Sequence, residues 1–423
     1  MVNTAGLSLD QAPPIAIPFL FFITAALFAV GLGTLLALLG ESPFVSRWSP
    51  QTLALTHLIT VGFLAQVMTG AMIQLLPVLA GSPLPAAVTV ARLVHLVLLT
   101  GAILLSGGFL TLHHATLMAG AVLLAFAFTL FLGAVAIALL RPGAPRQIGY
   151  AIGIGWVALI PTVILGLLLV FGYTGRLAFA DLPRLVDLHL SWGLLGWVGL
   201  VLFAVVFRLV PIFYVTREFP AWMKNRALPA VFALLVALSL GHWLDGVHLE
   251  TSLPLIVTVF ALFALSVFGV LHRRKRRIVD SSMLFIWTGL ASLLIAAVVW
   301  AASDNPLLLG VLLLAGVCLT VPTGLVYKVI PFLCWFHLQG LQIQREKFTH
   351  TLPSMKHFIS EKAARRHYLL HLAALLLLIT ACVLPADFGR PAGIALMLSS
   401  LLFLRNLLMA LIEYRKVRKA LLA

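Results

Sequence analysis

The chain has 423 residues, of which 62% are hydrophobic and only 10% are charged, and its formal net charge is +15. Soluble domains are nearer to half apolar and a quarter charged, so this composition excludes a soluble globular enzyme. It also excludes a disordered chain, because disorder requires low hydrophobicity. A polytopic membrane protein remains, and its backbone is expected to form helices because lipid offers no hydrogen-bonding partners.

Apolar runs long enough to cross a bilayer follow one another along the whole chain. They cover residues 14–39, 51–79, 86–107, 114–139, 148–172, 187–213, 228–248, 253–271, 282–302, 306–334, 367–385 and 391–412. We number these predicted spans one to twelve. The sequence therefore predicts an all-α fold of twelve transmembrane helices, with residues 1–423 forming a single transmembrane domain.

The basic residues are distributed unevenly between the loops. They gather after the even-numbered spans and in the C-terminal tail, as in the run 273–277. The loops after the odd-numbered spans carry only Arg47, Arg176, Arg184 and Arg390. Because Lys and Arg are retained on the cytoplasmic side, both termini are predicted to be cytoplasmic. The positive net charge is thus explained by basic residues on the cytoplasmic side of a lipid bilayer, which we expect to be a bacterial inner membrane. Nucleic acid is not an expected partner.

The segment 335–366 is the one long polar stretch between spans. It mixes both charges and contains His337, His350 and His357. We predict a cytoplasmic amphipathic connector, since the segment is too short to bury a core of its own. A small catalytic domain is the alternative.

Spans two, six and ten end with the same pattern: a long polar residue, two apolar residues, a proline and two further apolar residues. The three copies are residues 74–79, 208–213 and 328–333. Their recurrence every four spans predicts three similar four-helix units around a pseudo-threefold axis, at about 14–139, 148–271 and 282–412. Chance similarity between apolar helix ends is the alternative. The polar residues Gln74, Arg208 and Lys328 could bind something, but extension toward the lipid headgroups is the more usual role.

Thirteen histidines are many for a chain with so few polar residues. On the predicted topology, six of them share one level near the outer face: His57, His113, His114, His189, His242 and His248. Imidazole is the commonest metal ligand, so this level is a candidate metal or cofactor site. His57 and His189 are the strongest candidates because they occupy similar positions in spans two and six. The alternatives are core histidines bonded to helix carbonyls and, for His113, His114 and His248, wet interfacial positions.

The histidines beside basic cytoplasmic loops have a simpler interpretation. We expect them to contact lipid headgroups; they are His272, His337, His350, His357, His367 and His371. The three cysteines occur singly in apolar runs, so the sequence supports neither a disulfide framework nor a thiolate zinc site.

Together, the twelve spans, the repeat and the outer-side histidines resemble the catalytic subunit of haem-copper oxidases and nitric oxide reductases, and the related NnrS family of haem- and copper-containing membrane proteins. The string 56–77 and the string His189–Leu200 carry the local similarity. The resemblance implies haem ligation by His57 and copper ligation by His189. Span seven of the oxidases adds copper ligands, for which this chain offers His242 and His248. Span ten of the oxidases carries two haem-ligating histidines, whereas residues 306–334 contain none.

The sequence therefore favours a divergent member of this superfamily without a standard oxygen-reducing centre. We expect haem b, copper or both, with His57, His189 and His242 as cofactor ligands and His113, His114 and His248 as further metal candidates. The expected role is respiratory or nitric-oxide-related, and a cytochrome c-type or other respiratory subunit is a candidate partner. An enzyme of this kind would be a membrane oxidoreductase that acts on a small gas or transfers electrons. The alternatives are a membrane transporter and a cofactor-free structural or assembly subunit.

Overall fold

The computed structural model describes residues 13–141, 146–243, 249–275, 277–347 and 351–422. Within these ranges every regular element is a helix, which confirms the all-α prediction for them. Eleven of the described helices are long and apolar enough to cross a membrane, so this is a multi-pass membrane protein. The predicted span 367–385 has no counterpart among the eleven. Its helix, α16 (Glu361–Ala381), starts with a charged turn, and the total of twelve spans stays a prediction.

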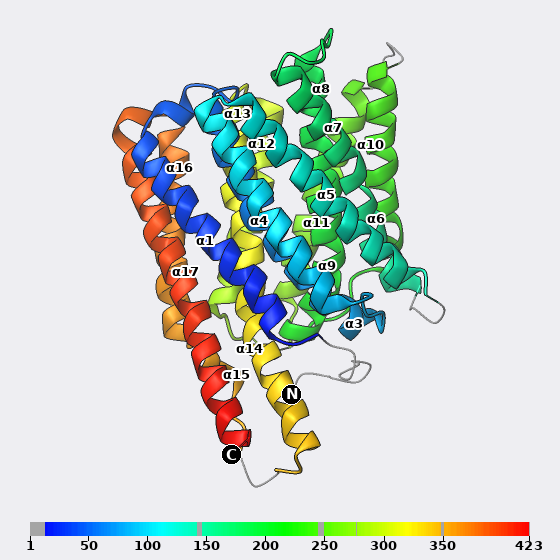
Figure 1. Ribbon diagram of the computed structural model, residues 1–423, viewed down its shortest axis with the longest axis vertical. Helices are drawn as coiled ribbons and strands as arrows, with labels where there is room; N and C mark the ends of the chain where they lie inside the picture. The colour runs from blue at the N-terminus through cyan, green and yellow to red at the C-terminus, as the bar shows by residue number, and fades with distance from the viewer. Residues whose placement is uncertain (1–12, 142–145, 244–248, 276, 348–350, 423) are drawn as a thin grey trace. The chain divides into compact units, whose positions relative to one another are not determined.

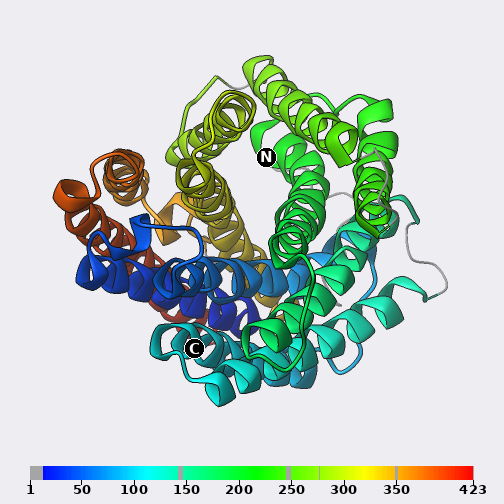
Figure 2. The same ribbon diagram turned by 90° about the horizontal axis from the view of Figure 1, so that it is seen from above.

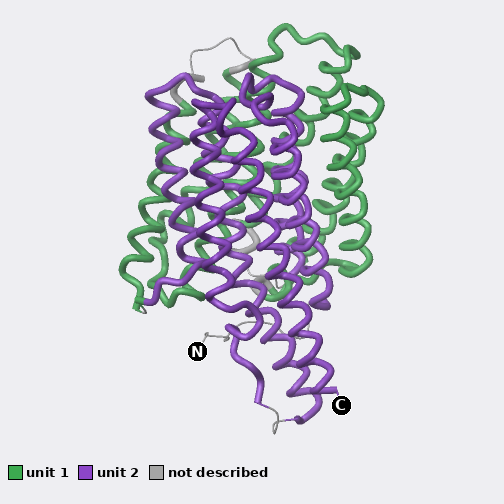
Figure 3. Tube along the Cα trace, turned by 90° about the vertical axis from the view of Figure 1, so that its left-hand side faces the viewer, with its two compact units in different colours: residues 1–11, 75–277 green, residues 12–74, 278–423 purple. Residues whose placement is uncertain are grey.

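The described chain divides into two compact units, which are treated separately below (Figure 3). Unit 1 contains Leu75–Arg277, and unit 2 combines Ala12–Gln74 with Ile278–Ala423. These boundaries differ from those of the three four-helix units that the sequence predicts. The arrangement of three units around an axis therefore stays a prediction.

Unit 1 is built around aromatic side chains. Trp156 and Trp197 lie at its centre, with ring centroids 6.0 Å apart, and Phe131 and Phe128 pack edge-on against them. Large rings supply much of the contact area in such a core. The helices of this unit are α4 (Ala87–Thr111), α5 (His114–Leu139), α6 (Arg146–Val157), α7 (Leu159–Tyr173), α8 (Leu182–Leu190), η3 (Ser191–Gly199), α9 (Leu200–Tyr214), η4 (Met223–Ala227), α10 (Leu228–Trp243) and α11 (Leu249–His272).

Unit 2 joins the two ends of the chain. Its first helix, α1 (Ala16–Leu39), runs alongside its last, α17 (Pro385–Leu422), as Figures 1 and 2 show. Glycines make this close approach possible, because Gly33 lies against the backbone of Met397 and Gly393 against that of Ala37. The other elements are η1 (Ser42–Phe44), α2 (Pro50–His57), η2 (Leu58–Leu64), α12 (Ser281–Ala302), α13 (Pro306–Val311), η5 (Leu312–Leu319), α14 (Thr320–Gln344), α15 (Met355–Phe358) and α16. Helix α3 (Ala65–Ala80) crosses the boundary between the units.

Spans two, six and ten share a backbone plan that extends beyond their proline-containing ends. Each begins with a polar cap whose side chain accepts a hydrogen bond from the backbone N–H three residues on, and a proline lies one or two residues after the cap; the caps are Ser49, Asp181 and Asn305. A short α-helix comes next, followed by a π-helical segment: η2, η3 and η5, respectively. The closing α-helix contains the shared proline: Pro77, Pro211 and Pro331. A rare element, the π-helix, therefore occurs at the same place in all three spans.

The predicted span ten ends at residue 334, whereas the helix that carries its end is longer. Helix α14 continues to Gln344, because Phe336 and Leu338 beyond this point are buried and extend the packed side of the helix. The C-terminal parts of α14 and α17 pack against each other and against α15 (Figure 1). Much of the predicted connector is therefore helical.

Candidate functional site

His57 is the last residue of α2, directly before the π-helical segment η2. Its side chain is half-buried, and Nδ1 lies 2.7 Å from the carbonyl oxygen of Leu53. A carbonyl oxygen can only accept, so Nδ1 of a neutral His57 ring carries the proton and Nε2 carries the lone pair. That tautomer is the one in which Nε2 serves as a metal ligand.

His189 repeats this arrangement in unit 1. It lies on α8, two residues before η3, and its Nδ1 is 3.0 Å from the carbonyl oxygen of Thr162 on α7. Nε2 again carries the lone pair. Gly166, one turn beyond Thr162, makes room for the ring: a Cβ there would lie 3.1 Å from Cε1 of His189. In both His57 and His189, Nδ1 thus bonds to a main-chain carbonyl oxygen, within α2 for His57 and across to α7 for His189.

The other predicted ligands are less alike. His113 is exposed and caps α5: the backbone N–H and the hydroxyl of Thr116 both bond to its Nδ1, at 3.3 and 2.7 Å. Its Nδ1 lone pair is thus used in capping. His114 is exposed and packs edge-on against Tyr173. His242 lies on α10, but its side chain and the whole of His248 lie outside the described residues.

The structure corrects the interpretation of two other histidines. His367 and His371, predicted to contact headgroups, are only 2% and 4% exposed. They lie one turn apart on α16 and face the interior of unit 2, so the headgroup prediction was wrong for both. The reason is that this side of α16 packs against α12 and η5 and bonds to α14, whereas the basic residues around it in the sequence suggest an exposed helix. The four-residue spacing of the pair was the available signal.

Each of these histidines bonds to a hydroxyl group of α14. The Thr320 hydroxyl donates to the carbonyl oxygen of Ala315 in η5, so Nε2 of His371 donates to Thr320, over 2.7 Å. Tyr327 accepts from the side-chain amide of Asn406 on α17, at 2.9 Å, so its hydroxyl donates to Nδ1 of His367, at 2.7 Å. These bonds connect three helices and the π-helical segment η5 through buried polar groups.

Aromatic rings enclose this buried network. Phe285 of α12 packs against both histidines, with its ring centroid 5.1 Å from each of theirs. Phe403 of α17 stacks on His367 from another side, at 5.5 Å. Apolar walls make an unpaired polar group costly, so the hydrogen bonds fix the imidazole orientations.

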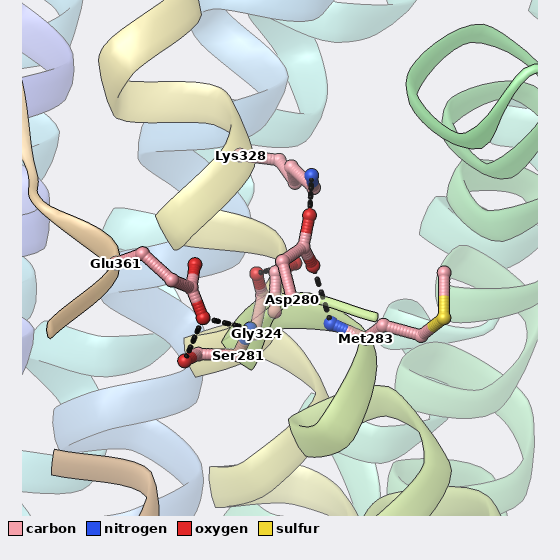
Figure 4. Close-up of polar contacts among 7 residues, drawn as sticks. Asp280, Ser281, Met283, Gly324, Lys328 and Glu361 are labelled. Atoms are coloured by element: carbon pink, nitrogen blue, oxygen red, sulfur yellow. Dashed lines mark hydrogen bonds and ion pairs between the residues drawn. The ribbon is translucent and has the colours of Figure 1, made fainter. Parts of the chain in front are cut away.

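A second polar cluster lies at the start of α12 (Figure 4). The Asp280 carboxylate caps this helix by accepting from the N–H of Met283, at 3.1 Å, and pairs with the ammonium group of Lys328 on α14. Ser281 donates from both its N–H and its hydroxyl to Glu361 at the start of α16, over 2.8 and 2.5 Å. The cluster fixes the starts of α12 and α16 against α14, beside the buried histidine network.

Three polar residues precede the shared prolines, and we predicted that their side chains extend to the lipid headgroups. Two of them, Gln74 and Lys328, are placed differently in the structure. Lys328 takes part in the ion pair with Asp280. Gln74 is only 1% exposed, so extension to the headgroups is wrong for this residue. Both of its amide atoms lack a hydrogen-bond partner among the described residues.

No group of three or more His, Cys, Asp or Glu side chains suited to a metal ion occurs among the described residues. The chain matches no protein-family model and has no significant match among curated proteins.

Proposed function

We propose that this multi-pass membrane protein binds haem b, with His57 as an axial ligand and His189 as a second ligand-bearing position. The proposal includes twelve spans with both termini in the cytoplasm of a bacterium, and a role in respiratory or nitric-oxide-related redox chemistry. It rests on one observation: in each of two spans, a histidine just before a π-helical segment has Nδ1 bonded to a main-chain carbonyl oxygen.

The chemistry of these residues favours haem over copper. Haem iron needs one or two axial imidazoles, because the porphyrin supplies its other ligands. Copper requires a larger protein donor set, and the side chains of the span-seven candidates, His242 and His248, lie outside the described residues. His57 would orient its Nε2 through the bond to Leu53, and His189 through the bond to Thr162.

Bound haem would supply one-electron exchange or binding of a small gas, while the helices restrict access of water. An enzyme of this kind would reduce a small gas or pass electrons on, with a cytochrome c-type subunit as a candidate donor. The absence of histidine in the predicted span ten argues against the ligand set of a standard oxygen-reducing centre.

Absorption spectroscopy of the purified protein, produced with haem supplied, tests the proposal. We expect a Soret band and reducible α-bands that are lost in His57→Ala. The matched control is His357→Ala, because this side chain is 47% exposed and pairs with Glu413 at 3.3 Å. A protein that folds but stays colourless and haem-free contradicts the proposal, as does a spectrum that His57→Ala leaves unchanged.

A membrane transporter is the second candidate function. The unpaired polar side chains of α3 favour it, because they place hydrogen-bonding groups inside a membrane-spanning helix. A haem-free protein that moves a solute across proteoliposome membranes would support this candidate over the first.

A further inference from the structure

Three polar side chains of α3 are buried without a hydrogen-bond partner among the described residues. They are Gln66, Thr69 and Gln74, here called the α3 triad, and they are 0%, 1% and 1% exposed. Both amide atoms of each glutamine and the threonine hydroxyl lack a partner. Nearly all buried polar groups in folded proteins are hydrogen-bonded, so five unpaired atoms on one helix require an explanation.

The α3 triad lies within the protein and not against lipid. At about 100° per residue, its three positions fall within one half of the helix circumference. Gly70, one turn beyond Gln66, lies on the same side and close to α1: a Cβ at Gly70 would be 2.5 Å from Cβ of Phe21. Lipid headgroups therefore cannot serve as the missing partners.

The shared plan of spans two and ten supplies an internal comparison. Counting back from the proline of each span, the residues equivalent to the α3 triad are Thr320, Thr323 and Lys328. All three have partners, which are His371, the Leu319 carbonyl oxygen and Asp280, respectively. Polar groups at these positions are therefore satisfied by the protein in span ten but not in span two.

Span six shows the other solution to the same problem. Its residues equivalent to Gln66 and Thr69 are Leu200 and Phe203, both 0% exposed and apolar. A buried position of this plan thus accepts an apolar side chain without difficulty. The helix of span two therefore does not require polar side chains at these positions. Their presence indicates a hydrogen-bonding partner that is not part of the protein.

The chemistry of the α3 triad identifies that partner. Two amides and a hydroxyl offer both donors and acceptors and carry no charge, which suits a small neutral molecule that donates and accepts hydrogen bonds. A buried water typically makes about three such bonds to otherwise unsatisfied groups. We propose that the α3 triad is an internal water-binding site that hydrates the interior of span two. The inference is independent of haem, because it concerns solvent access alone.

Thiol labelling of the full-length protein in proteoliposomes tests this inference. A methanethiosulfonate reagent that crosses membranes reacts with thiolates, which form only where water reaches the cysteine. We expect Gln66→Cys, Thr69→Cys and Gln74→Cys to react roughly tenfold faster than Met68→Cys and Met72→Cys, which are buried on the other half of the same helix. Peptide mass spectrometry reads each site, and native Cys318 and Cys334, both buried, are internal references.

Equal labelling rates at the triad, control and reference positions would overturn the inference. Thr69→Val provides a second measurement that needs no cysteine. If the hydroxyl binds water, removing it lowers the melting temperature, because bound water loses a partner. If the hydroxyl is dry, the isosteric valine removes an unpaired buried group, so an unchanged or raised melting temperature also overturns the inference.

Discussion

Span two and span ten are built on the same backbone plan but differ in how their polar groups are satisfied. Span ten, which lacks a histidine before its π-helical segment, receives partners from neighbouring helices: His371 from α16 for Thr320, and Asp280 at the start of α12 for Lys328. Span two has His57 at the corresponding end, and Gln66, Thr69 and Gln74 remain without protein partners.

This difference shows that one helical plan can serve two purposes. In span ten the polar groups connect helices, which stabilises their packing. In span two the equivalent positions hold polar groups without protein partners among the described residues, which is a pattern expected of functional sites. Substitutions that remove partners in span ten or alter the caps shared by both spans test this contrast.

The largest effect is expected for Tyr327→Phe. Removing the hydroxyl deprives both His367 and Asn406 of a partner inside an apolar enclosure. Each unsatisfied buried group costs about 1–3 kcal/mol, so the free energy of unfolding in detergent should fall by roughly that amount for each. Tyr368→Phe is the control, because it removes a single, part-buried bond to Thr288. Equal losses for the two variants would show that the network does not stabilise unit 2.

A smaller effect is expected for Thr320→Val, which leaves only Nε2 of His371 without a side-chain partner. The expected loss is about 1–3 kcal/mol, measured by chemical unfolding. Thr323→Val is the matched control on the same helix, because the Thr323 hydroxyl bonds only to the local carbonyl oxygen of Leu319. A control as damaging as Thr320→Val would mean that the bond to His371 contributes nothing.

Helix capping should be equally important in the two spans. Ser49→Ala and Asn305→Ala each remove the side-chain oxygen that accepts the N–H of Thr52 or Leu308. Loss of such a cap costs about 1 kcal/mol. We expect similar decreases in melting temperature for both variants. A large difference between them would argue against a common plan at these helix starts.

The smallest effect is expected for Lys328→Gln, which gives span ten the residue type that span two carries before its proline. The ion pair with Asp280 is partly exposed, with the two side chains 22% and 23% accessible. Pairs in such settings contribute about 0.2–1 kcal/mol, and salt screens them. We expect a slight loss of stability that shrinks as salt is added. A loss that is independent of salt would indicate a role in packing.

The sequence by itself determined the fold class and the positions of most membrane-crossing helices, because hydropathy and helix length are local properties. It also revealed the proline pattern of spans two, six and ten, but not their π-helical segments or the exact end of α14. Those features depend on which side of each helix is packed. Spans that are apolar all round have no alternation of polar and apolar residues from which the packed side could be predicted.

Only the tertiary structure decided which polar side chains have partners. His367 and His371 lie among basic residues in the sequence, yet both are buried on the side of α16 that packs against α12 and bonds to α14. Gln74 and Lys328 occupy equivalent places, yet only Lys328 meets a carboxylate. Hydrogen-bond partners come from residues far apart in the chain, and a buried polar group is stable only where packing brings them together. That is why the sequence could suggest His57 and His189 but could not show the α3 triad.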